Sequence, residues 1–237
     1  RECNAMQTID IPSSVDSIDS GAFYGCQGLI QLTLNEGLIS IGADAFRGCQ
    51  ALVTVTLPNS LLNIGDRAFY ECKSMTMAKF GTGLESLGTY AFRSCSALNV
   101  DITLPETLKN IGFGAFEYCS KLPAIMVQGS VERIEGSTFH DCFALQEISL
   151  PSTVKYVGRS AFCACRALDS IALPDSLTMI DNEAFYGCSI LRSFVLPELL
   201  DTIGDKAFYD CDALTEIEFN DALIYIGNEA FRRSSNL

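Results

Sequence analysis

A unit of about 23 residues recurs along the whole chain and limits the folds that the chain can adopt. The unit is clearest at positions 52–74, LVTVTLPNSLLNIGDRAFYECKS, and its recurring residues read Leu-x-x-Ile/Val-x-Leu-Pro-x-x-Leu-x-x-Ile-Gly-x-x-Ala-Phe-x-x-Cys-x-x. Its phenylalanine marks ten copies at a constant period, with one extra residue before the fifth, at Phe23, Phe46, Phe69, Phe92, Phe116, Phe139, Phe162, Phe185, Phe208 and Phe231. Self-similarity at a fixed period of this length is typical of a solenoid, in which a copy buries its apolar face only against its neighbours. We therefore expect one repeat domain over residues 1–237, without a linker.

The first part of each copy has the pattern of a short strand. In the reference copy, Val55 and Leu57 alternate with Thr54 and Thr56, and Pro58 follows. Alternation predicts one buried and one polar face, and proline ends the strand because it has no amide hydrogen to donate. Stacked copies would place equivalent strands about 4.8 Å apart, in a parallel sheet along one curved face.

The second part predicts a second extended piece and a tight turn. Ile64 is expected to point inward, Gly65 permits a turn, and Ala68, Phe69 and Cys72 are spaced as one side of a single helical turn. At about 1.5 Å per residue, a long helix does not fit before the next strand. We expect a single turn of 3₁₀- or α-helix here.

The Ile-Gly-x-x-Ala-Phe-x-x-Cys run and the Leu-Pro strand end resemble the leucine-rich repeats of the BspA-like, or Treponema pallidum-type, class, over essentially all 237 residues. The resemblance implies a curved, right-handed leucine-rich-repeat solenoid, mainly parallel β with short 3₁₀ or α turns and little regular helix. It also implies an extracellular or cell-surface location and a role in adhesion or protein binding.

Both ends of the chain lie inside the repeat pattern. Cys3 precedes Cys26 by one full period, and Leu237 follows Leu214 by the same interval. We expect a fragment of a longer array, monomeric unless its open ends stack. No apolar run is long enough to insert into a membrane.

The formal net charge of −13 argues against nucleic acid as a partner. Residues 169–229 hold thirteen acidic residues but only Arg192 and Lys206 as cations. This acidity either keeps an exposed surface soluble or receives a basic partner. The second interpretation makes an acidic patch the runner-up binding site, at Glu198, Glu216, Glu218 and Asp221.

Ten of the eleven cysteines share one place in the unit, three residues after the phenylalanine: Cys3, Cys26, Cys49, Cys72, Cys95, Cys119, Cys142, Cys165, Cys188 and Cys211. In-register stacking keeps their Cβ atoms about 4.8 Å apart, beyond the usual disulfide range. We expect buried thiols that act as small hydrophobic side chains. Their spacing fits no zinc site, and the sequence requires no cofactor.

The eleventh cysteine belongs to a different column. Cys163, His140 and Glu117 each follow the phenylalanine of their copy directly, so stacking would align them. A thiol, a base and a carboxylate in a row are the groups that cysteine hydrolases use. The same column also contains Arg47 and Tyr70, however, which is typical of an outer surface, and nothing in the sequence supplies an oxyanion hole. We therefore expect no enzymatic activity.

The outward positions of the strand face are the candidate binding surface, because solenoids usually bind there. The middle copies depart most from the unit: Ala78 replaces the inward Ile, Gly81 and Gln128 replace Pro, and one extra residue at positions 99–101 predicts a bulge. Ordinary drift in a repeat array also accounts for such departures. The candidate partner-binding residues are Thr56, Met77, Lys79, Val100, Asp101, Thr103 and Met126.

Two functions of different classes remain open. The first is a non-enzymatic adhesion or protein-binding module whose concave sheet face contacts a host or matrix protein. The second is a structural spacer that displays another domain of the parent protein. A spacer predicts outward residues that vary without clustering, whereas a binding module predicts a central apolar and charged cluster.

Overall fold

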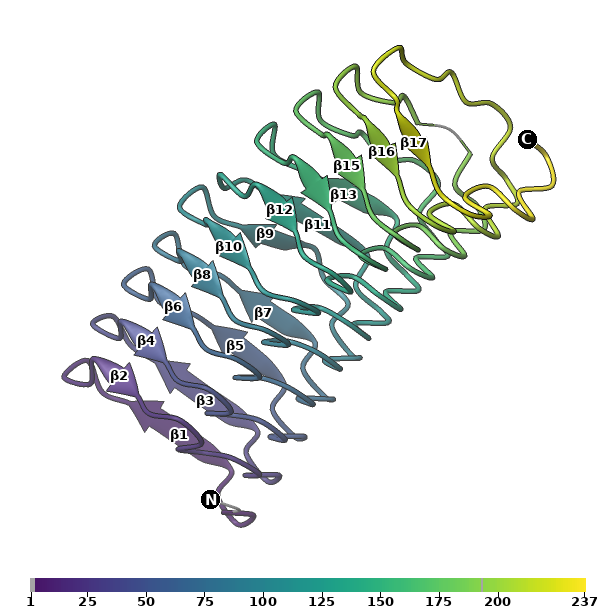
Figure 1. Ribbon diagram of the computed structural model, residues 1–237. Coiled ribbons are helices and arrows are strands. Elements are labelled where there is room, and N and C mark those ends of the chain that lie inside the picture. The colour runs from purple at the N-terminus through teal and green to yellow at the C-terminus, as the bar shows by residue number, and fades with distance from the viewer. Residues whose placement is uncertain (1–2, 193) are drawn as a thin grey trace.

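The repeated units fold as coils that stack from the N-terminal to the C-terminal end of the chain (Figure 1). The computed structural model describes residues 3–192 and 194–237. Arg1 and Glu2, which the sequence assigns to a preceding copy, lie outside the described residues. The described residues form parallel strands and turns without a helix, which confirms the expected solenoid.

Each coil contains up to two short strands. The first strands are β1 (Thr8–Ile11), β3 (Gln31–Leu34), β5 (Thr54–Thr56), β7 (Met77–Lys79), β9 (Ile102–Leu104), β11 (Ala124–Val127) and β13 (Glu147–Ser149). The second strands are β2 (Ser17–Ile18), β4 (Ser40–Ile41), β6 (Asn63–Ile64), β8 (Ser86–Leu87), β10 (Asn110–Ile111), β12 (Arg133–Ile134), β14 (Tyr156–Val157), β15 (Met179–Ile180), β16 (Thr202–Ile203) and β17 (Tyr225–Ile226). All pairings are parallel, and nearly all join residues one repeat apart.

The first strands form two separate sheets, β1-β3-β5-β7 and β9-β11-β13. The extra residue of the sequence lies where they separate, since the chain bends at Val100 and Asp101 lies outside any strand, directly ahead of β9. The expected bulge within a strand is therefore wrong, because the insertion ends the pairing between β7 and β9. After β13 the described residues form no further first strand. In one of these coils the inward residue is Phe194, which stacks on Phe208 at 4.6 Å, where other coils have a smaller aliphatic side chain.

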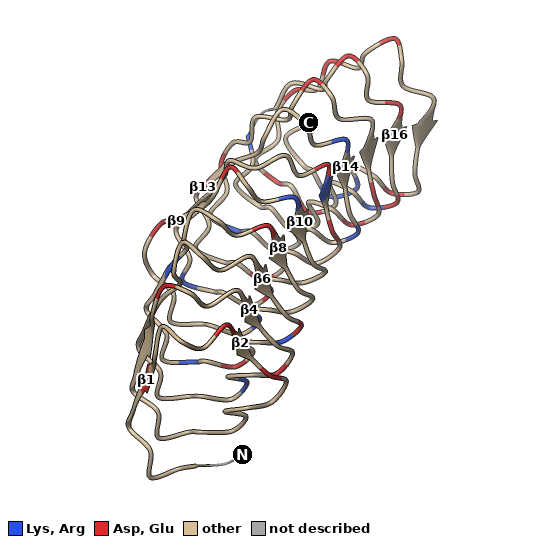
Figure 2. Cartoon of the chain, turned by 90° about the vertical axis from the view of Figure 1, so that its left-hand side faces the viewer, with Lys and Arg blue, Asp and Glu red and all other residues tan. Residues whose placement is uncertain are grey.

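The second strands also form two sheets, which divide between β10 and β12. The break coincides with the widest spacing between consecutive ladder phenylalanines, 5.9 Å between Phe116 and Phe139. Figure 2 shows that the array bends and that β1, β9 and β13 follow the outer edge of the bend. The expectation that the face formed by the first strands is concave is therefore wrong. The missing pairings between first strands account for the direction of the bend. Hydrogen-bonded strands hold coils closer together, so coils without these pairings lie further apart on the first-strand side.

The phenylalanine ladder is the centre of the core. Consecutive rings stack with centroids 5.1–5.9 Å apart along all ten copies. From Phe46 to Phe208 the ladder side chains are completely buried. Phe23 and Phe231 are only partly buried, since each is covered by a coil on one side.

The segment around each ladder phenylalanine is a series of tight turns and not the expected 3₁₀- or α-helical turn. In all ten coils the residues two before and two after the phenylalanine have positive φ, for example Arg67 at 55° and Glu71 at 60°. A right-handed helix cannot contain such residues. Alternate amides instead donate to the next coil, as Asp44 N does to Asp66 O and Phe46 N to Ala68 O, both at 2.8 Å. These bonds form a third ladder between coils, which we call the turn ladder.

We expect Ser94→Gly to stabilise the protein. Ser94 has φ 61° and its side chain forms no hydrogen bond among those of the described residues. Glycine removes the steric cost of this conformation, so the free energy of unfolding should rise by about 0.5–1 kcal/mol. In a helix the same change would lower it by a similar amount. Urea denaturation of both proteins decides the sign, and Ser94→Ala is the control because alanine keeps the Cβ.

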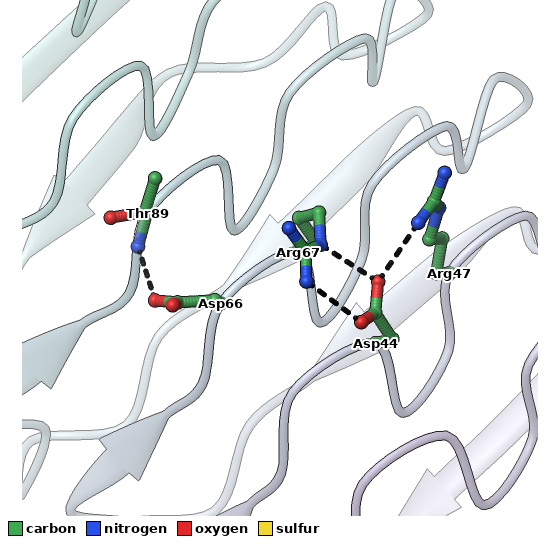
Figure 3. Close-up of polar contacts among 5 residues, drawn as sticks. All are labelled: Asp44, Arg47, Asp66, Arg67 and Thr89. Carbon is green, nitrogen blue, oxygen red and sulfur yellow. Dashed lines mark hydrogen bonds and ion pairs between the residues drawn. The ribbon is translucent and has the colours of Figure 1, made fainter.

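Side-chain hydrogen bonds also join neighbouring coils (Figure 3). The Asp44 carboxylate accepts hydrogen bonds from Arg67 Nε at 2.9 Å and Nη2 at 3.1 Å and from Arg47 Nη1 at 3.2 Å. Asp66 Oδ1 accepts the backbone amide of Thr89 at 2.8 Å. The arginines hold the pKa of Asp44 below its ordinary value, with Arg67 contributing most.

Candidate functional site

The structure divides the seven candidate binding residues into two groups on the face formed by the first strands, here the first-strand face. Thr56 and Lys79 are paired across β5 and β7, and Met77 lies on the same strand as Lys79. Thr103 and Met126 are paired across β9 and β11. Val100 and Asp101 lie directly ahead of β9, where the two sheets separate, and all seven side chains are exposed.

A hollow of about 440 Å³ lies beside Thr103 and Met126, on β9 and β11. Asp101, Thr103 and Met126 line it, whereas Thr56, Met77, Lys79 and Val100 do not. We call this the central hollow. Four residues whose side chains are buried in the core also line it: Ile102, Ile125, Ile148 and Ile171. Met126 is 45% exposed, so it stands at the surface of the hollow and not in the core.

Small side chains create the central hollow. Ala124, Ser149, Ser170 and Ala172 line it, whereas the equivalent outward positions of β7 hold Met77 and Lys79. The alternation of the sequence places these small residues on the outer face, but they were not among the seven candidate binding residues. A run of Ala and Ser at outward positions of consecutive copies is the signal that could have identified them.

Two carboxylates stand on opposite sides of Ala124 in the central hollow. Glu147 is the paired neighbour of Ala124 on β13, and Asp101 precedes Ala124 by one repeat. Glu147 and Asp101 are therefore about two strand spacings, or roughly 10 Å, apart along the array. Neither carboxylate forms an ion pair among the described residues, and both are exposed. The hollow thus combines small apolar surface with unneutralised negative charge.

A second hollow of about 550 Å³ adjoins the first and shares Met126 and Ser149 with it. Gln128, which replaces the Pro of the Leu-Pro strand end, and Gly129, which follows it, line this second hollow. Gly129 lies so close to the preceding coil that an added Cβ would be 2.0 Å from Leu108 O. Met126 and Ser149 therefore lie between two adjoining hollows of one surface.

The runner-up acidic residues are separate from the central hollow. Glu198 and Asp221 occupy the same place in successive coils, in the turn after the first segment, and Glu216 and Glu218 belong to the following coil. All four are exposed, and none forms an ion pair among the described residues. Figure 2 shows acidic segments at several places between β13 and the C-terminal end.

The cysteine column is buried as expected, except at its first member. From Cys49 to Cys211 each column thiol donates to the carbonyl of the ladder phenylalanine in the preceding coil, with S···O distances of 3.1–3.4 Å. Ser234 makes the same bond in the last coil at 2.9 Å. Burial raises the pKa of the Cys119 and Cys142 thiols well above their ordinary value. Cys3 is exposed, so the expectation that it is buried is wrong, because no described coil covers that end.

The polar column is also formed as expected from stacking. His140 Nδ1 lies 3.6 Å from Glu117 Oε1, and Glu117 Oε2 lies 2.9 Å from Arg93 Nε. Cys163 of the next coil and Glu117 raise the pKa of His140 to about 10. Sequence reasoning did not include Asp141, whose Oδ2 lies 3.5 Å from His140 Nε2.

Within residues 3–192 and 194–237, no group of three or more His, Cys, Asp or Glu side chains is arranged to hold a metal ion. The same part of the chain contains no helix that is long and apolar enough to cross a membrane.

Parallel coils, short first strands and a buried phenylalanine ladder define a leucine-rich-repeat solenoid. The chain belongs to the BspA-type leucine-rich-repeat family, because the model of the BspA type leucine rich repeat region (6 copies) matches residues 1–123 and 109–237. No curated protein matches the chain.

Solved structures share this fold. The leucine-rich-repeat protein TpLRR of T. pallidum is 33% identical with a TM-score of 0.65, over 69% of this chain and 78% of that one. The pneumococcal vaccine antigen PcpA is 22% identical with a TM-score of 0.60, over 94% of this chain and 65% of that one. A leucine-rich-repeat protein from Eubacterium ventriosum is 16% identical with a TM-score of 0.52, over 91% and 85%. At these identities the last two show the fold alone.

Proposed function

We propose that this chain is a non-enzymatic protein-binding module and that the central hollow receives the partner. The observation that carries the proposal is the hollow itself, which small outward side chains leave open beside the exposed Met126. A concave, mostly apolar site with a few polar groups is typical of recognition sites. Methionine suits a contact surface because its unbranched, polarisable side chain adapts to the partner's shape.

The partner that fits the central hollow is a protein that presents a lysine or arginine side chain. Its aliphatic stem would lie against Met126 and Ala124, and its charged end would reach Glu147 or Asp101. A carboxylate that gains a cation in a partly desolvated site contributes more than an exposed pair on the rim. The formal charge of −13 further favours encounter with a basic partner and disfavours nucleic acid.

The setting that we propose is extracellular or on a cell surface, with a host or matrix protein as the partner. Family membership supports it, and a solved structure with the same fold is that of a pneumococcal vaccine antigen. The second candidate function, a spacer that displays another domain, draws support from the uninterrupted phenylalanine ladder, which makes a stiff array.

Filling or neutralising the central hollow should weaken binding by at least about tenfold, because residues at the centre of an interface dominate its energy. The partner is first isolated by affinity capture on the wild-type protein and then titrated, by calorimetry, against Ala124→Leu, Glu147→Gln and Met126→Ser. Ala124→Leu occupies the space that the partner's side chain needs. None of the three side chains belongs to the core, so the melting temperature should remain nearly unchanged.

Met77→Ser is the matched control, because Met77 is also an exposed methionine of the first-strand face but lies outside the central hollow. It should bind like the wild type. If Glu216→Gln with Glu218→Gln and Asp221→Asn abolishes binding while Ala124→Leu has no effect, the acidic patch is the site. A purified protein that captures no partner would favour the spacer.

A further inference from the structure

The junction between the coil of Phe116 and the coil of Phe139 is open on one side. Their second strands, β10 and β12, are one repeat apart but are not paired. At the other eight junctions, the residue after the second strand donates its amide to a second-strand carbonyl of the preceding coil at 2.7–2.9 Å, as Gly158 N does to Ile134 O. The equivalent bond from Glu135 N to Ile111 O is not formed among the described residues.

A hollow of about 340 Å³ lies at this opening, and we call it the junction gap. Lys109, Asn110, Ile111, Ser130, Glu132, Arg133 and Glu135 line it. The amides of Glu132 and Glu135 and the carbonyls of Lys109 and Ile111 make no hydrogen bond across it among those of the described residues. No backbone hydrogen bond between second strands therefore has to break when the junction gap widens or narrows.

The turn ahead of β12 is one reason for the junction gap. Ser130 N donates to Leu108 O at 2.9 Å, whereas in the next coil it is a side chain, Thr153 Oγ1, that reaches the equivalent carbonyl of Val131 at 2.8 Å. The backbone around Ser130 is thus pulled toward the preceding coil, which the missing side chain of Gly129 permits. The chain then enters β12 along a different path from that in the other coils.

Glu135 is the second reason. It stands where the neighbouring coils have Gly112 and Gly158, and a Cβ on either glycine would lie 2.5–2.6 Å from backbone atoms of the preceding coil. A side chain at this place therefore favours separation of the coils. Asp181 keeps its bond to Val157 O at 2.9 Å, however, so a side chain alone does not open a junction. The changed turn and Glu135 act together.

The other two sides of this junction are closed. Thr103 and Leu104 on β9 pair with Met126 and Val127 on β11. The turn ladder is also complete, with bonds of 2.9–3.0 Å from Gly114 N to Gly136 O, from Phe116 N to Thr138 O and from Tyr118 N to His140 O. Two bonded sides and one open side form a pivot.

We propose that this junction is a hinge on which the array bends. It joins an N-terminal arm, residues 3–122, to a C-terminal arm, residues 123–192 and 194–237. The arms rotate about the β9–β11 pairing and the turn ladder, and the junction gap changes its width. Hinges lie where a few residues absorb a change that the packed elements on both sides do not share.

The hinge has a consequence for the central hollow, which rests on the proposed function. Asp101 and Thr103 belong to the N-terminal arm, whereas Met126 and Glu147 belong to the C-terminal arm. The angle between the arms therefore sets the spacing of the two carboxylates. A partner that contacts both arms would select one angle, because it binds that conformation more tightly.

Hydrogen exchange of the protein without a partner tests the junction gap. Relative to their intrinsic rates, the amides of Glu132 and Glu135 should exchange at least about tenfold faster than those of Lys155 and Gly158, the equivalent residues of the next coil, which donate at 2.8 Å. A repaired variant carries Gln128→Pro, Gly129→Asn and Glu135→Gly, which are the residues of the reference copy at these places. In this variant the difference should largely disappear.

Pulsed electron paramagnetic resonance between two spin labels tests the motion itself. Labels at Ser86→Cys and Met179→Cys span four coil spacings across the junction, whereas labels at Ser17→Cys and Asn110→Cys span four spacings inside the N-terminal arm. Both pairs lie on second strands, and none of the four side chains is buried. Cys3→Ser and Cys163→Ser first remove the two cysteines that are not buried.

The distance distribution should be at least about twofold broader for the pair across the junction than for the pair inside one arm, and the repaired variant should narrow it. Equal widths for the two pairs, protected amides at Glu132 and Glu135, or an unchanged width in the repaired variant would each overturn the proposal. All of these measurements are made without a partner. A failure to capture a partner would therefore count against the proposed function and leave the hinge as measured.

Discussion

Replacing Phe116 by alanine is expected to lower the free energy of unfolding by about 3–5 kcal/mol, because the change removes a fully buried ring and leaves a cavity. Phe116 has no exposed surface and stacks on Phe92 at 5.6 Å and on Phe139 at 5.9 Å. The edge of the Phe80 ring also contacts it, with centroids 6.4 Å apart. Chemical denaturation followed by circular dichroism measures the change.

Two controls test whether stacking is the cause. Phe113→Ala removes a ring from the same coil, but that ring is 41% exposed, so we expect a loss of at most about 1 kcal/mol. Phe231→Ala removes a ladder ring that stacks on one ladder neighbour, Phe208, at 5.4 Å and meets the edge of the Phe219 ring at 6.0 Å, and its loss should lie between the other two. Equal losses at Phe116 and Phe231 would contradict a core that depends on neighbours at both sides.

Replacing Gly88 by alanine should lower the free energy of unfolding by about 1–3 kcal/mol, although it adds a single methyl group. The added Cβ would lie 2.5 Å from Gly65 C and from Asp66 N, both backbone atoms of the preceding coil. It would also lie 2.7 Å from Asp66 Oδ1, the oxygen that accepts the Thr89 amide in Figure 3. The two coils must therefore move apart. Asp181 occupies the equivalent place later in the array, so we expect strain and not unfolding.

Gly48→Asn is the control for this prediction, because it adds a larger side chain where only the backbone conformation matters. Gly48 has φ 73°, and the nearest atom to an added Cβ is Gly25 Cα at 3.8 Å. Asparagine tolerates this conformation better than other side chains, so the loss should stay below about 1 kcal/mol. Denaturation of both variants gives the comparison. A larger loss for Gly48→Asn than for Gly88→Ala would contradict the close approach of coils at Gly88.

The period of the sequence was sufficient to predict the solenoid, its core and its cysteine column. In a repeat array every copy meets only its neighbours, so a residue that recurs at one place must stack on itself. Phe69 and Cys72 therefore had to form ladders, whatever the details of the turns between them. The same logic aligned Glu117, His140 and Cys163 before any distance was known.

Local conformation in the turns could not be predicted in the same way. Twenty positions have positive φ on the two sides of the ladder phenylalanines, and only five of them are glycine, so the residue that usually signals this conformation is missing. Neighbouring coils impose the conformation instead, because it aims alternate amides at the next coil. The sequence pattern of Ala68, Phe69 and Cys72 fits a helical turn equally well, and only the hydrogen bonds between coils distinguish the two.

The candidate site required the tertiary structure for a related reason. The sequence showed that Met126 and Thr103 face outward, but whether outward residues form a hollow depends on the size of their neighbours and the spacing of the coils. One extra residue ahead of β9 ended the pairing with β7 and separated Met77 and Lys79 from the rest. The direction of the bend likewise follows from small differences in spacing between opposite sides of each coil. The repeated residues thus determine that coils stack and what they bury, whereas the tertiary structure decides where adjacent coils separate and which outward side chains share a surface.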